Sequence, residues 1–106
     1  MIDEEQLKKL IGTRIKELRT KSGKKQLELA SAVDLKRTSI TNIEAGKQML
    51  TIPVLYRICY ELDVNIFDVM PEFDDLLRHK VEANLSDSSV EIGGKTMAAL
   101  KRVRNV

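Results

Sequence analysis

Cysteine, large aromatic residues and long apolar runs are scarce or missing in this sequence. Its 106 residues include one cysteine, no tryptophan, two tyrosines and two phenylalanines. A single cysteine cannot form an internal disulfide, which fits a reducing compartment. The first residues, Met-Ile-Asp-Glu-Glu-Gln, are acidic where a secretory signal would be basic and then apolar. Because no run of about 18 apolar residues is present, no membrane span is predicted and we expect a cytoplasmic protein.

Side chains suited to catalysis or metal binding are equally few. The one histidine, His79, has no second metal ligand near it, and the sequence contains no Gly-rich phosphate loop and no paired Cys/His set. Cys59 lies on an apolar stripe with no activating base evident, so it is interpreted as a small core residue. We therefore predict that the protein is not an enzyme and that it has no catalytic residue, cofactor or metal site.

Charge is plentiful and unevenly distributed, although the formal net charge is only +2. Ten basic and three acidic residues lie between Lys8 and Arg37, whereas four basic and eight acidic residues lie between Thr38 and Glu82. A mixture of charges is what the surface of any small soluble protein needs. It also fits a domain with one basic pole that meets phosphate and an acidic pole that points away. We favour the second interpretation because the basic segment contains the motif described next.

Residues 26–46 contain two short helical patterns separated by a break at Asp34. The apolar positions of each pattern share one helical face, namely Leu29, Ala30 and Val33 in the first and Ile40 and Ile43 in the second. Between its apolar positions the second pattern exposes hydrogen-bonding side chains, namely Lys36, Arg37, Thr38, Thr41 and Asn42. A helix this short needs neighbours to be stable. A buried helix, a turn and a second helix with a polar outer face are what reading DNA in the major groove requires.

The segment from about Ile11 to Pro71 resembles the helix-turn-helix domain of the phage repressor and Cro-like (xenobiotic-response-element) regulators. Four motifs carry the resemblance, in order and at the family's spacing: Arg14-Ile15-Lys16-Glu17-Leu18-Arg19, Gln26-x-x-Leu29-Ala30, Thr38-Ser39-Ile40-x-x-Ile43-Glu44-x-Gly46-Lys47 and Leu55-x-x-Ile58-x-x-x-Leu62-x-Val64. The resemblance implies an all-α fold, with a five-helix repressor-like helix-turn-helix domain over residues 1–71. Residues 72–106 would form an additional C-terminal helical extension.

The resemblance also implies roles for individual residues. The base-reading positions of the family fall on Lys36, Arg37, Thr38 and Asn42, whose side-chain types suit guanine, adenine and the thymine methyl group. Gln26 matches the family position that grips the DNA backbone, and the chemistry of four more residues suits phosphate or capping contacts: Lys25, Ser39, Thr41 and Lys47. The arginine and glutamate that tie the family's first helix to its recognition helix fall on Arg19 and Glu44, so we expect that ion pair here.

Three positions depart from the family's pattern. Lys25 and Lys36 stand where relatives usually carry a Ser or Thr N-cap. A lysine cannot accept hydrogen bonds from the free amides of a helix start, so about 1 kcal/mol of capping is expected to be missing at Lys25. Asp34 stands where relatives most often carry glycine, and aspartate tolerates the left-handed backbone of the turn better than most residues.

Three further helices are predicted around the motif. The first runs from about Asp3 to Lys21, with a core-facing stripe of Leu7, Ile11, Ile15 and Leu18. The next helix follows a Thr51 cap with Pro53 in its first turn and runs to about Leu62, burying Ile52, Leu55, Ile58, Cys59 and Leu62. Residues 65–68 resemble a capping box that opens a short fifth helix ending before Pro71.

The last part of the chain is only loosely specified by its sequence. Residues 72–83 place Phe73, Leu76, Leu77 and Val81 on one helical face, which either a twin copy or the chain's own domain would bury. Residues 84–94 are interpreted as a linker. Residues 95–106 form a weak basic helix that either reaches the DNA backbone or serves as a soluble tail.

Together these patterns predict a sequence-specific DNA-binding transcriptional regulator without a membrane association. It would bind double-stranded DNA as a homodimer on an inverted-repeat operator, through a recognition helix near residues 36–44, and repression is the commonest outcome in the family. The alternative is an antitoxin-like or adaptor protein that binds a protein partner through residues 84–106 and autoregulates its own operon.

Overall fold

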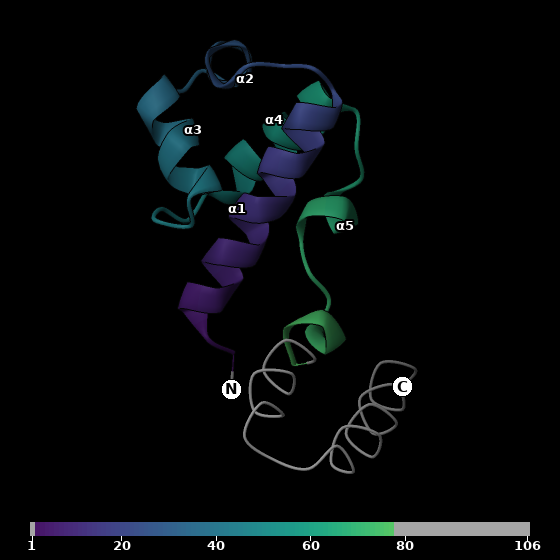
Figure 1. Cartoon of the computed structure of the whole chain (residues 1–106). Coiled ribbons are helices and arrows are strands. Elements are labelled where there is room, and N and C mark those ends of the chain that lie inside the picture. Colours follow the sequence, from purple (N-terminus) through teal and green to yellow (C-terminus); the bar gives the residue numbers. More distant parts are fainter. Residues whose placement is uncertain (1, 78–106) are drawn as a thin grey trace. The chain divides into compact units, whose positions relative to one another are not determined.

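The computed structural model describes residues 2–77, and its five labelled helices confirm the predicted all-α, five-helix fold (Figure 1). The helices are α1 (Glu4–Lys21), α2 (Gln26–Ala32), α3 (Arg37–Glu44), α4 (Ile52–Leu62) and α5 (Ile66–Val69). All five belong to one compact unit, Asp3–Pro71, while a second unit holds Ile2 and the described residues 72–77. The predictions for His79, Val81, the linker and the basic tail helix fall outside the described residues.

Local sequence sets both ends of α1. The Asp3 side chain caps its start by accepting hydrogen bonds from the amides of Glu5, at 2.9 Å, and Gln6, at 3.5 Å. This carboxylate also favours the positive end of the helix dipole. The helix closes at Ser22, and Gly23 then turns the chain with a φ of 76°.

α4 and α5 are capped by their own sequences as well. The Thr51 hydroxyl accepts from the amide of Val54 at 3.4 Å, and Asp63 ends α4 in the left-handed conformation, with a φ of 53°. At α5 the Asn65 side chain accepts from Phe67, while the Asp68 carboxylate accepts from the amide of Asn65, both at 2.9 Å. These two contacts at the start of α5 form the reciprocal capping box that the sequence predicts for this short helix.

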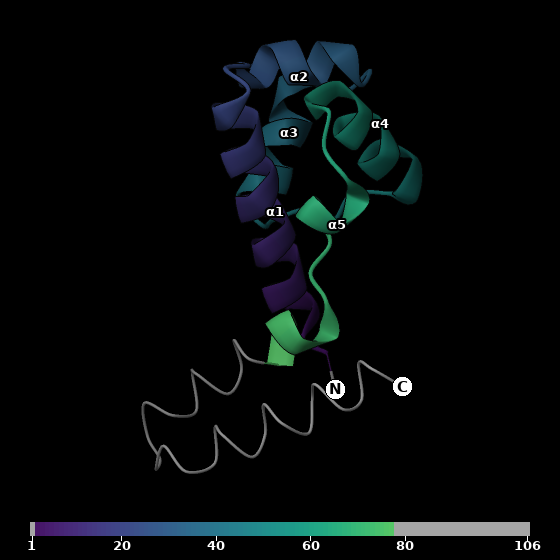
Figure 2. The same ribbon diagram turned by 90° about the vertical axis from the view of Figure 1, so that its right-hand side faces the viewer.

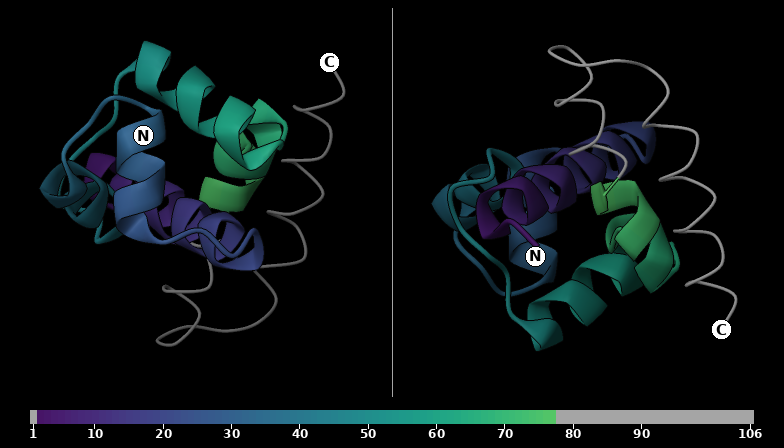
Figure 3. Two further views of the ribbon diagram at one scale, coloured as in Figure 1. Left: turned by 90° about the horizontal axis from the view of Figure 1, so that it is seen from above. Right: turned by 90° about the horizontal axis from the view of Figure 1, so that it is seen from below.

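The five helices enclose one apolar core. α3 contacts α1 and α2, α2 also contacts α4, and α5 contacts α1 and α4, so the contacts close a ring. Seen from above, α1 and α4 flank this ring and α3 closes one end (Figure 3). α2 crosses the end of the unit, next to α3 (Figure 2). The ring buries Ile11, Ile15, Leu29, Ala30, Val33, Ile40, Ile43, Leu55, Ile58, Cys59, Leu62 and Val69.

One predicted core residue is not buried. The expectation that Ile52 packs inside is wrong, because its side chain is 64% exposed. Ile52 is the first residue of α4, so its position at the edge of the apolar stripe leaves it outside the ring of contacts. Leu7 and Leu18 of α1 pack only partly against the core that Ile11 and Ile15 enter fully.

Two glycines allow α1 to approach α3 closely. A Cβ added to Gly12 would collide with the backbone carbonyl oxygens of Ile43 and Glu44. Gly46 has a φ of 74°, and a Cβ there would lie 2.9 Å from the Cα of Lys9. Any larger side chain at Gly12 would therefore push the first helix away from the end of α3.

The second unit is described only up to residue 77. Residues 73–77 are helical, and of the predicted apolar stripe Leu76 is buried whereas Phe73 is 69% exposed. Across residues 2–77, no helix combines the length and the apolar content that a membrane span requires.

Candidate nucleic-acid interface

The turn between α2 and α3 has the backbone conformation that the sequence predicts. Asp34 has a φ of 59°, which places it in the left-handed region. The amide of Leu35 donates to the carbonyl of Ala30 at 2.8 Å, and the amide of Asp34 donates to the carbonyl of Ser31 at 3.3 Å. These bonds satisfy free carbonyls at the end of α2 and redirect the chain into α3.

α3 has one buried face and one exposed face. Ile40, Ile43 and Glu44 are buried, and they hold the helix against α1 and α2. The helix begins after Lys36, whose backbone is extended and whose side chain makes no capping hydrogen bond. The first turn of α3 therefore keeps free amides that no side chain of its own satisfies.

The four predicted base-reading residues are Lys36, Arg37, Thr38 and Asn42, and all of them are exposed. Within residues 2–77, none of their side chains takes part in a hydrogen bond or ion pair. Lys36, Arg37 and Thr38 lie at the start of α3, and Asn42 lies one turn later. They present a cation, a guanidinium, a hydroxyl and a carboxamide on one short segment.

The five predicted backbone-contacting residues lie around this segment. Lys25, Thr41 and Lys47 are exposed, whereas Gln26 and Ser39 are partly buried. Lys25 precedes α2 without a side-chain cap, but its own backbone amide donates to the Glu28 carboxylate at 3.0 Å, which is one half of a capping box. Lys47 follows the left-handed Gly46, beyond the end of α3.

A chain of side-chain contacts joins α1, α2 and α3. Arg19 donates from Nε to Oε2 of Glu44 at 2.6 Å and from Nη2 to Oε1 at 3.0 Å, which is a bidentate ion pair. The Glu44 side chain is 2% exposed and that of Arg19 is 12% exposed. A third bond from Arg19, from Nη1 to the Lys24 carbonyl at 2.7 Å, fixes the loop before α2. The first helix is thus locked to the end of α3.

Gln26 extends this chain toward the exposed face. Its Nε2 donates to Oε1 of Glu44 at 3.1 Å, and its Oε1 accepts from the Thr41 hydroxyl at 2.9 Å. The same hydroxyl also lies 3.0 Å from the Arg37 carbonyl. Because the amide oxygen is occupied by Thr41, the second N–H of Gln26 is the group left for another acceptor. The sequence assigns Gln26 and Thr41 to DNA separately and does not predict that they bond each other.

The cysteine has no role in this surface. Cys59 is buried in α4, and burial, followed by the nearby charge of Asp68, raises the pKa of its thiol above the usual range. A thiol with a raised pKa is a poor nucleophile. Within residues 2–77, no group of three His, Cys, Asp or Glu side chains is placed to hold a metal ion.

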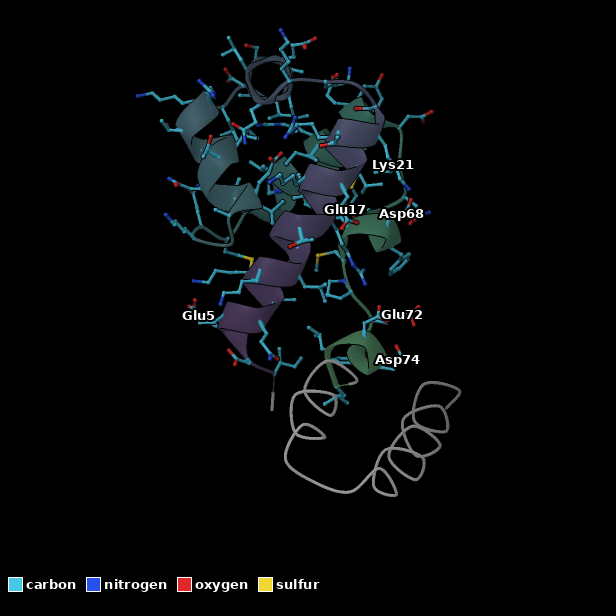
Figure 4. The ribbon with its side chains drawn as sticks, viewed as in Figure 1. Glu5, Glu17, Lys21, Asp68, Glu72 and Asp74 are labelled. Carbon is cyan, nitrogen blue, oxygen red and sulfur yellow. The ribbon has the colours of Figure 1, made fainter. Side chains whose placement is uncertain are left out.

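Acidic side chains lie on several elements of the unit, including Glu28 at the start of α2 and the exposed Asp34 of the turn. Figure 4 places Glu17 on α1 and Asp68 on α5, with Asp68 on the side of the unit away from α3. The first turn of α3 carries no acidic residue. The start of α3, with Lys36 and Arg37, is therefore the basic part of this surface.

The comparisons with known proteins agree with this geometry. Residues 12–70 match the family described as "Helix-turn-helix domain", so the chain belongs to that family. It is a DNA-binding transcriptional regulator of the Cro/C1 type, and this class is not enzymatic. No curated protein sequence matches the chain.

Several solved structures share the fold. The restriction-modification controller protein C.AhdI from Aeromonas hydrophila is 25% identical, with a TM-score of 0.61 over 64% of this chain and 99% of that chain. The clp gene regulator ClgR from C. glutamicum is 24% identical, with a TM-score of 0.58 over 59% of this chain and 81% of that chain. A SinR protein/SinI protein complex is 24% identical, with a TM-score of 0.56 over 91% of this chain and 99% of that chain.

Proposed function

We propose that this regulator reads a specific double-stranded operator with the exposed face of α3. The observation that carries the proposal is the set of four exposed side chains, Lys36, Arg37, Thr38 and Asn42, that bond to nothing else in residues 2–77. Three of them suit a particular group on the edge of a base pair. Arg37 suits O6 and N7 of guanine, Asn42 suits N6 and N7 of adenine, and the methyl group of Thr38 suits that of thymine.

The surrounding residues fix the register of the protein on the duplex. Lys25 and Lys47 supply charge for phosphates, Ser39 supplies a hydroxyl, and Gln26 supplies the N–H that Glu44 leaves unused. Thr41 contributes by orienting Gln26, since its only hydroxyl hydrogen lies between acceptors of the protein itself. Phosphate contacts of this kind position the recognition helix without reading sequence.

The proposed regulator acts as a homodimer of two 1–71 domains. Two recognition helices related by a two-fold axis enter successive major grooves about 34 Å apart, which requires an inverted-repeat operator. Occupation of such a site blocks polymerase, so repression is the proposed outcome. C.AhdI, at 25% identity, is described as a restriction-modification controller protein.

Selection of bound DNA from a random pool tests this function. The expected result is an inverted repeat whose half-sites are one helical turn apart. Arg37→Ala should relax the preference at one base pair and cost ~1–3 kcal/mol, whereas Lys47→Ala should weaken all sequences alike and lower the salt dependence. If both variants bound cognate and random DNA with unchanged affinity, the assignment of this face would be lost.

A second proposed function is the binding of a protein partner through residues 84–106. It is favoured by one comparison, because one structure with the same fold is that of a SinR protein/SinI protein complex. Purification of the full chain from its own cells should then yield a stoichiometric partner that a chain ending at residue 83 does not retain. Retention of that partner by the shortened chain would contradict this role.

A further inference from the structure

α4 carries a second apolar stripe that nothing in its own unit covers. Ile52, Tyr56 and Tyr60 are 64%, 56% and 83% exposed, and they follow one another at four-residue spacing. Residues spaced in this way lie next to each other along one side of a helix. They flank the buried stripe that includes Leu55 and Ile58. A surface helix normally places polar residues there, so this stripe needs a different explanation.

The stripe borders a shallow groove. Tyr56 and Tyr60 line it with Arg57 and Glu61 of the same helix and with Ala32 at the end of α2. Tyrosine and arginine are enriched where proteins contact each other, because each combines a large apolar surface with a polar tip. Three of the five lining residues, Tyr56, Arg57 and Tyr60, are therefore of types that protein interfaces favour.

The charges of the groove indicate which protein binds there. Arg57 and Glu61 are one helical turn apart, and within residues 2–77 neither forms an ion pair. When α4 lies antiparallel to a second α4, Arg57 faces Glu61 of the second copy, and the two-fold axis repeats the pair. Tyr56 then faces Tyr60 of the second copy across the same axis. This helix face is self-complementary, as an isologous contact must be.

We propose that two copies of this chain associate through the α4 face, with Tyr56 and Tyr60 at the centre and Arg57 paired with Glu61 across the axis. The inference rests on the proposed homodimer and assigns its surface. It uses none of the residues proposed to contact DNA. It also explains why the first residue of α4, Ile52, remains apolar although it is exposed.

Reversal of the two charges tests this interface. Sedimentation velocity over a range of concentrations gives the dimer Kd of the full chain. Arg57→Glu places two carboxylates opposite each other at both ends of the contact, and Glu61→Arg does the same with two cations, so each should raise the dimer Kd at least about tenfold. The double variant Arg57→Glu/Glu61→Arg should recover the original Kd. An equimolar mixture of the two single variants should form a 1:1 heterodimer, since every facing pair is then opposite in charge.

A matched pair of aromatic substitutions separates this stripe from general surface apolarity. Tyr60→Ser should raise the dimer Kd, whereas Phe67→Ser should leave it unchanged, because Phe67 is 73% exposed but lies on α5. The side chains at the four substituted positions, Arg57, Tyr60, Glu61 and Phe67, are exposed or line the groove. Circular dichroism checks that each variant folds. Equal effects of Tyr60→Ser and Phe67→Ser would overturn the proposal.

The result is independent of whether the protein reads DNA. Two results would overturn the α4 interface. One is a wild-type chain that stays monomeric at every concentration up to millimolar. The other is a pair of single charge variants that keep the wild-type dimer Kd. Whether or not the α4 interface forms, DNA reading would be supported if one copy bound a duplex with a single half-site and Arg37→Ala abolished this binding. Failure of both readouts would remove the interface and the function together.

Discussion

α3 and α4 are neighbouring helices of one small unit, yet they are stabilised in different ways. α4 has a side-chain cap at Thr51, a left-handed closing residue at Asp63 and a continuous buried stripe. α3 has only eight residues, and no side chain caps it. What holds α3 in place comes from other helices, through Arg19 of α1 and Gln26 of α2.

This difference separates the residues that stabilise the fold from the residues at the start of α3 whose side chains remain available to a ligand. A Ser or Thr at position 36 would cap α3, but the chain places Lys36 there and follows it with Arg37 and Thr38. Sequences that specify a fold well tend to break local rules where they bind something. The stability that α3 lacks locally is supplied by the contact chain from Arg19 to Thr41, which leaves its outer face open to a ligand.

The largest expected effect comes from removing Arg19. Arg19→Ala leaves the Glu44 carboxylate, which is 2% exposed, buried without its cation. Breaking a buried pair from one side costs about 3–5 kcal/mol, so urea unfolding should show a loss of this size. DNA affinity should fall as well, because the end of α3 is then no longer fixed to α1.

The double variant Arg19→Met/Glu44→Met is the control. Replacing both charges by apolar side chains of similar length leaves no unpaired charge, so the loss should be well below the sum of the two single losses. If Arg19→Ala and the double variant unfolded at the same urea concentration, the ion pair would not be what secures α3.

Gly12→Ala should have the next largest effect. A Cβ at this position meets the backbone carbonyls of Ile43 and Glu44, which have no room to move without shifting the helix. Alanine in the middle of a helix normally gains up to about 1 kcal/mol over glycine, so an observed loss of about 1–3 kcal/mol would have to come from this close approach. Thermal unfolding followed by circular dichroism measures it.

Gly23→Ala provides the comparison for Gly12. Nothing lies within 4 Å of a Cβ added there, but the φ of 76° is unfavourable for alanine. Its loss should be about 1 kcal/mol and should leave DNA binding unchanged. A Gly12→Ala variant as stable as the wild type would show that α1 and α3 are less closely packed than the geometry requires.

The sequence predicts local features of these helices, but it does not predict the contacts between them. Caps, helix lengths and the left-handed Asp34 follow from residues a few positions apart, and the exposed face of α3 follows from its helical spacing. The need for glycine at position 12 does not, because it arises from a carbonyl that is more than thirty residues away in sequence. The bond between Gln26 and Thr41 and the exposure of Ile52 likewise depend on how helices pack, which spacing within one helix does not encode.

Thr51→Ala tests whether α4 is stabilised locally. The variant loses the hydrogen bond from the amide of Val54, which is long at 3.4 Å, so the expected cost is about 0.5–1 kcal/mol in urea unfolding. DNA affinity should change less than about twofold, since α4 supplies no proposed DNA contact. If the free energy of DNA binding fell by more than the free energy of unfolding, α4 would also act on the recognition surface.

Lys36→Ser should change stability by about as much as Thr51→Ala, but with the opposite sign. The backbone at position 36 is already extended, with φ −80° and ψ 152°, so a serine hydroxyl can accept an amide of the first turn of α3. We expect a gain of about 0.5–1 kcal/mol in urea unfolding. Operator affinity should nevertheless fall by about tenfold, because a cation at the base-reading face is lost. A helix that becomes more stable while its protein binds DNA less tightly is the outcome that only a residue kept for the ligand produces. If both stability and affinity rose, Lys36 would be an imperfect cap and not a DNA-reading residue.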